Sequence, residues 1–424
     1  MHPKWLKYIR RTVSVVFLTA FALIFLDFTT NLPEKLIKST TYLQFIPSLL
    51  KFIQVPVLTL FGFMVVLILT LLFGRVYCST VCPLGILQDA ISWVRRRFQS
   101  KRKRRYSYSK PLHILRYSLL GLTAVSLLLG SITLTMLLDP YSIFGRIFSD
   151  LFRPLVVLLN NGVSTLLQNQ EVFWLYHVDL APFHISVTLT SILFLGLITW
   201  MASRRGRLYC NTVCPVGTFL GWLSKYSLYK VRIDKTTCTS CTICQRDCKA
   251  ECIDMATRSV DNSRCVTCFN CLTGCPFDSI KFAPKLGFAA PKAIAPDTGT
   301  APAQKATGTQ ANPRRKFFQT ALTTAAALPL LSKAQEIVSH SATVPIHRKT
   351  PVSPPGSEEI ERFNDACTAC HLCVSVCPTQ VLQPAVSHYG LAYIMQPRMD
   401  YHAGYCNFDC TKCGEVCPTG AILK

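Results

Sequence analysis

Charged residues are scarce in this sequence, and acidic residues are only about half as common as basic ones. Of 424 residues, 16% are charged and 50% hydrophobic, and 22 Asp and Glu stand against 45 Lys and Arg. So few charges are unlike a soluble protein of this length and indicate an integral membrane protein. The net charge of +23 would suit nucleic-acid binding, but the basic residues gather beside apolar stretches, where membrane orientation accounts for them. We therefore expect a lipid bilayer as partner and no nucleic acid.

The sequence also lacks the features of a disulfide-rich secreted protein. We expect no cleavable export signal at its start, and its 21 cysteines are regularly spaced. Irregular spacing would have suggested a disulfide framework. Regular spacing of so many cysteines predicts metal ligands instead.

Four stretches approach the roughly 20 apolar residues that a membrane-spanning helix needs. They are residues 13–28 with their flanks, 56–73, 114–138 and 185–202. A fifth stretch, 151–167, is interrupted by polar residues, and an interfacial or re-entrant helix suits it better. Lys and Arg cluster before the first stretch, in 95–105 and after the fourth. The positive-inside rule therefore places the N-terminus and the segment after the fourth stretch in the cytoplasm.

One motif occurs twice, as GRVYCSTVCPLG at 74–85 and as GRLYCNTVCPVG at 206–217. The first copy follows the second apolar stretch, and the second copy follows the fourth. The repeated unit is therefore two apolar stretches and one motif, in the same orientation each time. Such a repeat predicts a pseudo-two-fold axis along the membrane normal. The two cysteines of a copy share one face of a helix. The four candidate metal or redox residues are Cys78, Cys82, Cys210 and Cys214. They could hold a fifth iron–sulfur cluster or another soft metal, or they could be packing residues at a tight helix exit.

The runs CTSCTICQRDC and CVTCFNCLTGCP have the C-x2-C-x2-C-x3-C spacing of bacterial ferredoxins with two 4Fe-4S clusters. Three ligands of a cluster come from one tight loop, and the fourth comes from the other run. One cluster is therefore predicted on Cys238, Cys241, Cys244 and Cys275. The other is predicted on Cys265, Cys268, Cys271 and Cys248.

Cys252 has no counterpart in the other cysteine runs. When the tails after the fourth cysteines are aligned, Cys248 takes the ligand position, although Lys249 replaces the usual proline. Cys252 then falls where Ser279, Val381 and Ala421 stand in the other tails. We predict that Cys252 is a small buried residue, and a ligand swap with Cys248 stays open.

A second ferredoxin module is predicted from CTACHLCVSVCP and CNFDCTKCGEVCP. In the latter, three residues instead of two separate the first two cysteines. The crossed assignment places one cluster on Cys367, Cys370, Cys373 and Cys417. It places another on Cys406, Cys410, Cys413 and Cys377. CTACH also fits the C-x-x-C-H haem-attachment pattern with His371 as axial ligand, but haem would remove two ligands from a complete run. Zinc accepts four-cysteine sets as well, yet four interlocked runs favour clusters.

Between the modules, residues 286–313 are rich in Pro, Ala, Gly and Thr, which is typical of a flexible linker. Residues 314–334 begin with RRKFF and continue as a weakly apolar stretch, similar to a twin-arginine export signal inside the chain. Such signals carry folded, cofactor-loaded domains. We therefore expect the second module outside the cytoplasm and the first inside. A fifth membrane segment or an exposed helix are the alternatives.

The order of four apolar stretches, two CxxxCP motifs and a two-cluster ferredoxin resembles the NapH, MauN and CcoG group of polyferredoxins over residues 1–285. The RRKFF segment with the second module resembles NapG and MauM over residues 314–424. The chain thus resembles a fusion of the two types. The resemblance implies a quinol dehydrogenase component that passes electrons from the quinone pool to a periplasmic redox partner. The flavin-bearing domain of NosR-type relatives is expected to be absent.

The predicted fold class is a membrane α-helical bundle of four transmembrane helices, or five, with two small α+β ferredoxin-like domains. The predicted parts are 1–229 (membrane domain), 230–285 (first ferredoxin), 286–313 (linker), 314–334 (signal or fifth segment) and 355–424 (second ferredoxin). We expect a multi-pass protein of the inner (plasma) membrane. Electron relay is the leading function. A CcoG-like copper-handling factor for oxidase maturation and a redox-sensing scaffold are the competing ones.

Overall fold

The computed structural model describes residues 3–27, 29, 32–54, 60–99, 105–171, 175–180, 184–284, 351–386, 389–390 and 393–424. They belong to one unit, formed by residues 1–287 and 350–424. The predicted linker, 286–313, and the twin-arginine-like segment, 314–334, lie outside the described residues.

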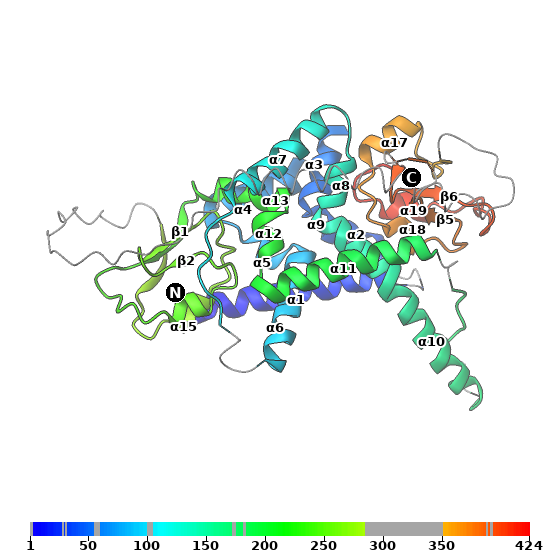
Figure 1. Ribbon diagram of the computed structural model, residues 1–424. Coiled ribbons are helices and arrows are strands. Elements are labelled where there is room, and N and C mark those ends of the chain that lie inside the picture. The colour runs from blue at the N-terminus through cyan, green and yellow to red at the C-terminus, as the bar shows by residue number, and fades with distance from the viewer. Residues whose placement is uncertain are drawn as a thin grey trace, which may run out of the picture. The chain divides into compact units, whose positions relative to one another are not determined.

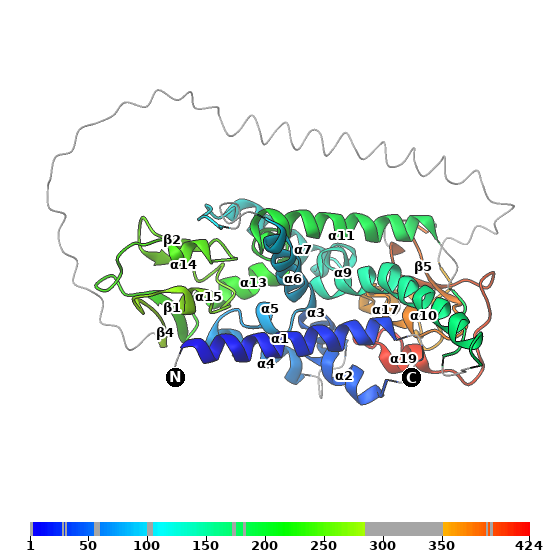
Figure 2. The same cartoon turned by 90° about the horizontal axis from the view of Figure 1, so that it is seen from below.

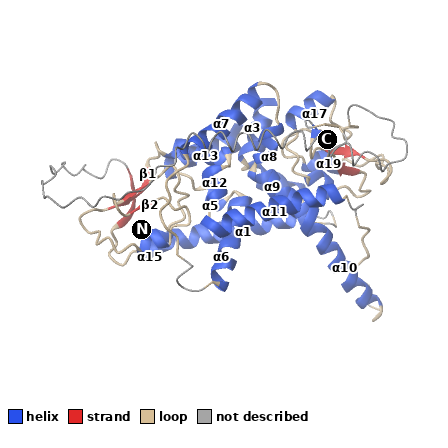
Figure 3. Ribbon diagram, viewed as in Figure 1, coloured by secondary structure: helices blue, strands red, loops and turns tan. Residues whose placement is uncertain are grey.

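Helices dominate the described chain before residue 229 (Figures 1 and 3). They are α1 (Pro3–Leu26), α2 (Glu34–Tyr42), α3 (Phe45–Gln54), α4 (Leu60–Phe73), α5 (Tyr77–Thr80), α6 (Pro83–Phe98), α7 (His113–Leu128), α8 (Thr133–Leu138), α9 (Pro140–Ile147), the π-helix η1 (Phe148–Phe152), α10 (Arg153–Gln168), α11 (Ile185–Arg205), α12 (Leu208–Thr212) and α13 (Pro215–Ser224). Both copies of the CxxxCP motif fold alike. A short helix, α5 or α12, carries the first cysteine, the second caps the next helix, and the proline occupies its first turn, where a missing N–H costs nothing.

The two modules after residue 229 combine short helices with two-stranded antiparallel pairs, in keeping with the predicted α+β class. The first contains β1 (Tyr229–Ile233) paired with β4 (Ile280–Pro284), β2 (Ile253–Asp254) paired with β3 (Ser259–Val260), α14 (Ile243–Arg246) and α15 (Asn270–Gly274). The second contains α17 (Ile360–Ala366), α18 (Leu372–Ser375), β5 (Leu382–Pro384) paired with β6 (Pro397–Met399), and α19 (Lys412–Val416).

The first apolar segment runs between the modules, and the second ends at the first module (Figures 1 and 2). Helix α1 begins beside α15 of the first module, where Lys7 Nζ donates to Thr273 Oγ1 at 3.0 Å, and it also contacts α18 of the second. Helix α3 contacts α17 of the second module. The end of α4 lies at the first module, where Thr267 Oγ1 donates to Phe73 O at 3.4 Å.

The last two apolar segments connect the same modules. Arg116 of α7 donates to Ser263 O of the first module at 3.3 Å, and Met136 of α8 packs with Met395 of the second. Helix α11 is linked to the second module through Asp150, as described below. Directly after α11, Arg207 N donates to Lys249 O of the first module at 3.2 Å. Three of the four segments, 13–28, 114–138 and 185–202 with the residues that flank them, therefore lead from one module to the other.

Two of the four predicted spans are single helices long and apolar enough to cross a membrane, among the residues that the structure describes. These are α1, over Trp5–Leu26, and α11. Helix α4 has 14 residues within the described part of the chain, and residues 55–59 directly before it are not described. The predicted span 114–138 divides into α7 and α8 near Gly130, whose φ of +75° is left-handed and ends the helix. A bundle of four continuous spanning helices is therefore not confirmed. The interrupted stretch 151–167 forms η1 and α10.

Aromatic side chains join α1 to α9. Phe21 meets Tyr141 edge to face at 6.0 Å between ring centroids, and Phe25 meets Phe144 at the same distance. Such pairs contribute roughly 0.5–1.5 kcal/mol beyond area burial. Helix α9 begins here because the Asp139 carboxylate accepts from Ser142 N at 2.9 Å, a side-chain cap. The packing fixes α9 between α1 and the second module.

Candidate iron–sulfur centres

The structure gathers the cysteines of the first module into two groups. Four of them line one cavity together with Cys252: Cys248, Cys265, Cys268 and Cys271. The others surround Cys244. Burial, followed by the nearby thiols of Cys241, Cys275 and Cys238, raises the pKa of Cys244 to about 11. Each group takes three cysteines from one run and one from the other, as two cubane clusters require.

The second module shows the same division. One cavity is lined by Cys367, Cys370, Cys373 and Cys417. A second cavity is lined by Cys377, Cys406, Cys410 and Cys413. The last run therefore still brings its cysteines to one cavity, although one more residue separates its first two cysteines. That these sixteen residues bind clusters stays a prediction, which their grouping supports.

Three of the four cysteine loops carry the same backbone strain. The residues on both sides of the middle cysteine have positive φ: Ser240 (57°) and Thr242 (62°), Thr267 (50°) and Phe269 (59°), Ala369 (51°) and His371 (62°). Each such non-glycine residue costs about 1–3 kcal/mol. Alternating right- and left-handed residues turn successive N–H groups toward one point, which suits an anionic iron–sulfur cluster. The loops therefore fit the cofactor that the spacing predicts.

Cys252 lies beside a predicted ligand. Its Sγ is 3.5 Å from Cys248 Sγ, and the side chain is buried, as the sequence predicts. The hydrogen bond between them lowers the pKa of Cys248 and raises that of Cys252. The spacing of the run, in which Cys248 takes the fourth ligand position, therefore assigns the cluster to Cys248 and leaves Cys252 beside it.

Replacing these two cysteines separately should give opposite results. Cys248→Ser is expected to lose one cluster, about four iron atoms, because it removes a ligand. Cys252→Ser is expected to leave the iron content unchanged. Iron analysis and electron paramagnetic resonance of both variants make the measurement. The reverse pattern would exchange the roles of the two residues.

His371 does not stand free for haem. Its Nδ1 lies 2.8 Å from Asp150 Oδ1, and its Nε2 lies 2.9 Å from Met395 O, so both ring nitrogens are engaged. Asp150 also accepts from Ser191 Oγ of α11 at 2.7 Å. The imidazole is fully buried. His371 therefore anchors the second module to η1 and α11, which the sequence did not reveal.

The second module makes a further close contact with α9. A Cβ added to Gly145 would overlap the backbone oxygen of Cys370 and the ring of Phe25. Tyr141 is buried as well, and burial, followed by the charge of Cys370, raises its pKa well above the usual value. Only a glycine at 145 lets the Cys370 loop approach the helices this closely.

The two copies of the CxxxCP motif meet through a reciprocal pair of arginines. Arg75 Nη2 donates to Cys210 O at 3.0 Å, and Arg207 Nη1 donates to Cys78 O at 2.6 Å. Both guanidinium groups are fully buried. In this exchange, the arginine of each copy binds the carbonyl of the first cysteine of the other copy. A pseudo-two-fold axis between the copies would produce it.

The same exchange requires glycine in each motif. A Cβ on Gly85 would overlap Cys78 O and approach the Arg207 guanidinium, and a Cβ on Gly217 would overlap Cys210 O and approach Arg75. The four motif cysteines are all buried in the same core. Arg75 Nη2 is also 3.8 Å from Cys78 Sγ, which places a cation beside the thiols, where it would offset the negative charge of a bound cluster.

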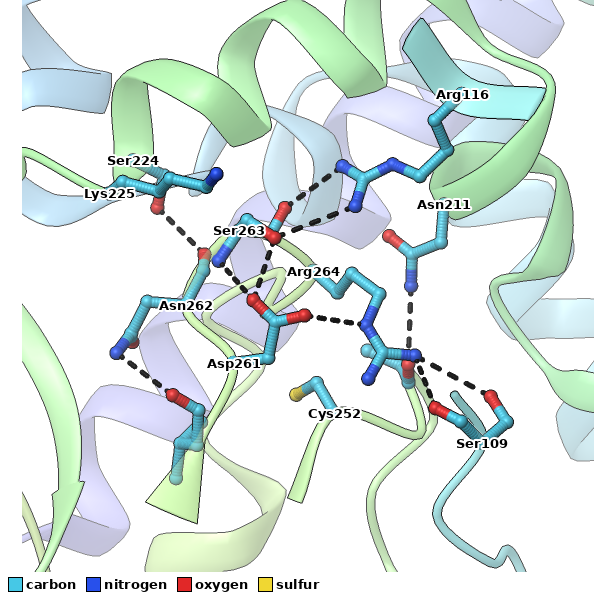
Figure 4. Close-up of polar contacts among 12 residues, drawn as sticks. Ser109, Arg116, Asn211, Ser224, Lys225, Cys252, Asp261, Asn262, Ser263 and Arg264 are labelled. Atoms are coloured by element: carbon cyan, nitrogen blue, oxygen red, sulfur yellow. Dashed lines mark hydrogen bonds and ion pairs between the residues drawn. The ribbon is translucent and has the colours of Figure 1, made fainter. Parts of the chain in front are cut away.

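Polar contacts fasten the first module to this core (Figure 4). Arg116 Nη2 donates to Ser263 O at 3.3 Å. Arg75 Nη1 also donates to Ser263 O, at 3.1 Å, and Asn211 Nδ2 donates to Ala250 O at 3.2 Å. Arg264 bridges Asp261 of its own module, at 2.8 Å, and Ser109 O of the segment before α7, at 2.8 Å. The module is thus held by buried hydrogen bonds and not by the chain connection alone.

Comparison with known proteins finds two 4Fe-4S families in the chain. A family described as "4Fe-4S binding domain" matches residues 55–102 and 187–235, and one described as "4Fe-4S dicluster domain" matches 366–421. An uncharacterized protein of Methanocaldococcus jannaschii is 26% identical, over 64% of this chain and 90% of its own length. The ferredoxin-type protein NapH of Escherichia coli is 28% identical, over 51% of this chain and 65% of its own length. The methylamine utilization ferredoxin-type protein MauN of Methylobacillus flagellatus is 27% identical, over 41% of this chain and 48% of its own length.

This chain is similar to the ferredoxin-type proteins NapH and MauN and contains 4Fe-4S binding domains. It spans 65% of the length of the Escherichia coli NapH and 48% of that of the Methylobacillus flagellatus MauN. No solved structure matches it. The 4Fe-4S families and the ferredoxin-type relatives support an iron–sulfur electron-transfer protein. The first family covers the two copies of the CxxxCP motif, so the internal repeat coincides with a 4Fe-4S binding domain.

Among the residues that the structure describes, no three His, Cys, Asp or Glu side chains are arranged to hold a single metal ion.

Sequence reasoning missed the buried charges that surround the motif. Asp89 of α6 binds Arg207 Nε at 2.8 Å, Lys249 Nζ at 2.9 Å and Arg10 Nη1 at 3.4 Å. Burial alone would raise the pKa of Asp89, but Arg207 and Lys249 outweigh it and hold that pKa far below its usual range. The sequence offered one signal of this network, the lysine at 249 in place of the proline expected after Cys248. Its side chain pairs with Asp89.

Proposed function

We propose that this polyferredoxin is the membrane component of a quinol dehydrogenase, relaying electrons from the quinone pool to a periplasmic reductase. The observation that carries the proposal is one continuous buried core. It contains Cys248 of the first module, Cys78 and Cys210 of the repeat, and Cys370 of the second module. A relay needs redox centres in such a sequence, shielded from water.

The connections between the modules support such a path. Three of the four apolar segments lead from one module to the other, and α1, with 24 residues, is about 36 Å long. That length exceeds the roughly 30 Å of a bilayer core. A chain that spans the membrane through α1 would have the two modules near opposite surfaces, and it would carry electrons across.

The residues of the chain hold and insulate the centres. The cysteines supply thiolates, and the bound clusters supply one-electron transfer. Arg75 and Arg207 place positive charge at the repeat. His371 and Asp150 keep the second module against the helices, and the buried aromatic rings of α1 and α9 exclude water between them.

Quinol oxidation by the purified protein tests the proposal. A reduced short-chain menaquinol or ubiquinol analogue, mixed anaerobically with the detergent-solubilised protein, is expected to bleach the visible absorbance of the clusters. Dithionite then gives the fully reduced end point. Clusters that dithionite reduces but quinol leaves oxidised would contradict the proposal.

Copper handling for oxidase maturation is the second candidate function. The four repeat thiols are buried in one core, and soft thiolates suit Cu(I). The match of both repeats to the 4Fe-4S binding domain favours the relay instead. Copper that copurifies at the repeat, without quinol turnover, would favour maturation.

A further inference from the structure

A large cavity lies between α1 and α6, outside every cysteine site described above. Its volume is about 400 Å³, within the range of roughly 300–1,000 Å³ that small-molecule sites occupy. Apolar side chains form much of its wall, among them Val15 and Leu18 of α1 and Ile86, Ala90 and Trp93 of α6. Val15 and Trp93 are also exposed on the surface of the apolar helices. A lipophilic molecule could therefore enter from the bilayer.

The polar part of the wall is strongly cationic. Lys7, Arg10, Arg11, Arg96 and Lys249 line the cavity, and Asp89 is the carboxylate among its lining residues. Three of the four lone-pair sites of that carboxylate are taken by Arg207, Arg10 and Lys249. Arg10 is 8% exposed, and its Nε has no hydrogen-bond partner among the described residues. A ligand with oxygen acceptors would satisfy that donor.

The cavity adjoins the first module at a predicted cluster. Two of its lining residues, Lys249 and Asn270, are chain neighbours of the predicted ligands Cys248 and Cys271. Lys249 and Arg10 are also close enough to Cys268 for their charges to act on its thiol. An electron donor in the cavity would stand next to this centre.

We propose that this cavity binds the headgroup of the quinol, with its isoprenoid tail leaving between α1 and α6. The assignment rests on the proposed function and names the site for it. A phospholipid phosphate would also meet cations here, but it would gain nothing from the apolar wall or from the adjoining cysteines. The flat ring of a quinol uses both, since its faces pack on apolar side chains and its oxygens meet the cations.

The chemistry balances with the groups at the site. The quinol loses two electrons and two protons and becomes the quinone. The oxidant is the iron–sulfur centre that Cys248, Cys265, Cys268 and Cys271 would hold. This centre would take one electron, pass it to the next centre of the relay and then take the second. The cations favour the deprotonated quinol, and the protons pass to water at the cytoplasmic surface. The remaining acceptor site of Asp89 can receive a hydrogen bond from the quinol hydroxyl.

Filling the cavity tests the assignment without touching the charges. Ala90→Phe is expected to slow cluster bleaching by quinol by about tenfold or more, the equivalent of about 1.4 kcal/mol. Its iron content and its reduction by dithionite should match wild type. Ala124→Phe is the matched control, since Ala124 lies exposed on α7 and does not line the cavity. That variant is expected to react at the wild-type rate.

Binding is measured separately through tryptophan fluorescence, which quinones quench. Oxidised decyl-ubiquinone is expected to quench wild type with a saturable component that is lost in Trp93→Phe and in Ala90→Phe. Trp200→Phe, which removes an exposed tryptophan of α11, should retain it. The assignment would be overturned if all three variants lost the saturable quenching. It would also be overturned if both Trp93→Phe and Ala90→Phe retained it.

Three further outcomes are distinct. If quinol fails to reduce even the wild-type clusters, the proposed function fails. If quinol reduces wild type and Ala90→Phe equally fast, only the cavity assignment fails. If Ala90→Phe loses a copurifying anionic phospholipid while its quinol reaction is unchanged, the cavity is a lipid site and the assignment is overturned.

Discussion

Purified without oxygen, the protein is expected to contain about 20 iron atoms per chain, four in each of five clusters. Sixteen of its 21 cysteines fall into the four module groups. The fifth cluster is expected on Cys78, Cys82, Cys210 and Cys214. Both copies of the motif match a 4Fe-4S binding domain, and the buried Arg75 and Arg207 would offset the cluster's negative charge.

A double variant isolates the fifth cluster. Cys78→Ser with Cys210→Ser removes one ligand from each copy, and the iron content should fall to about 16 atoms, the four module clusters. Cys252→Ser is the matched control, a buried cysteine that is not a predicted ligand. Iron near 16 in wild type and double variant alike would leave the repeat without a cluster. Iron near eight would contradict the two-module interpretation.

The second large effect concerns sidedness. A reporter enzyme active only in the periplasm, fused after Lys424, is expected to be active, whereas the same reporter fused after Pro284 should be silent. The Lys and Arg distribution places the first module in the cytoplasm. Because α1 contacts α15 of the first module and α18 of the second, a membrane crossed by α1 would separate the modules. One further crossing is then needed within 285–350.

The twin arginines decide how that crossing is made. Replacing Arg314 and Arg315 by Lys is expected to abolish reporter activity after Lys424, because twin-arginine export depends on the pair. Unchanged activity in this variant would mean that a plain membrane segment carries the module across. A silent wild-type fusion would contradict export itself and would leave both modules in the cytoplasm.

The fold was predictable where local sequence rules dominate. The spacing of cysteines predicted two ferredoxin modules, and the structure groups those cysteines into four sets. The helices at 13–28 and 185–202 were recognisable because long apolar stretches allow little else. The break near Gly130 was missed, since hydropathy reports composition and is insensitive to a single left-handed residue.

The sequence by itself determined the chemistry, because a cubane cluster demands thiolates at fixed separations along a short loop. It also determined the repeat, whose two copies can be aligned by eye. Only the tertiary structure decided what lies between the centres. The Arg75 and Arg207 exchange, the Asp89 network and the His371–Asp150 link join residues far apart in the chain. No local pattern records such partners, because a buried charge is stabilised by whichever opposite group the fold brings to it.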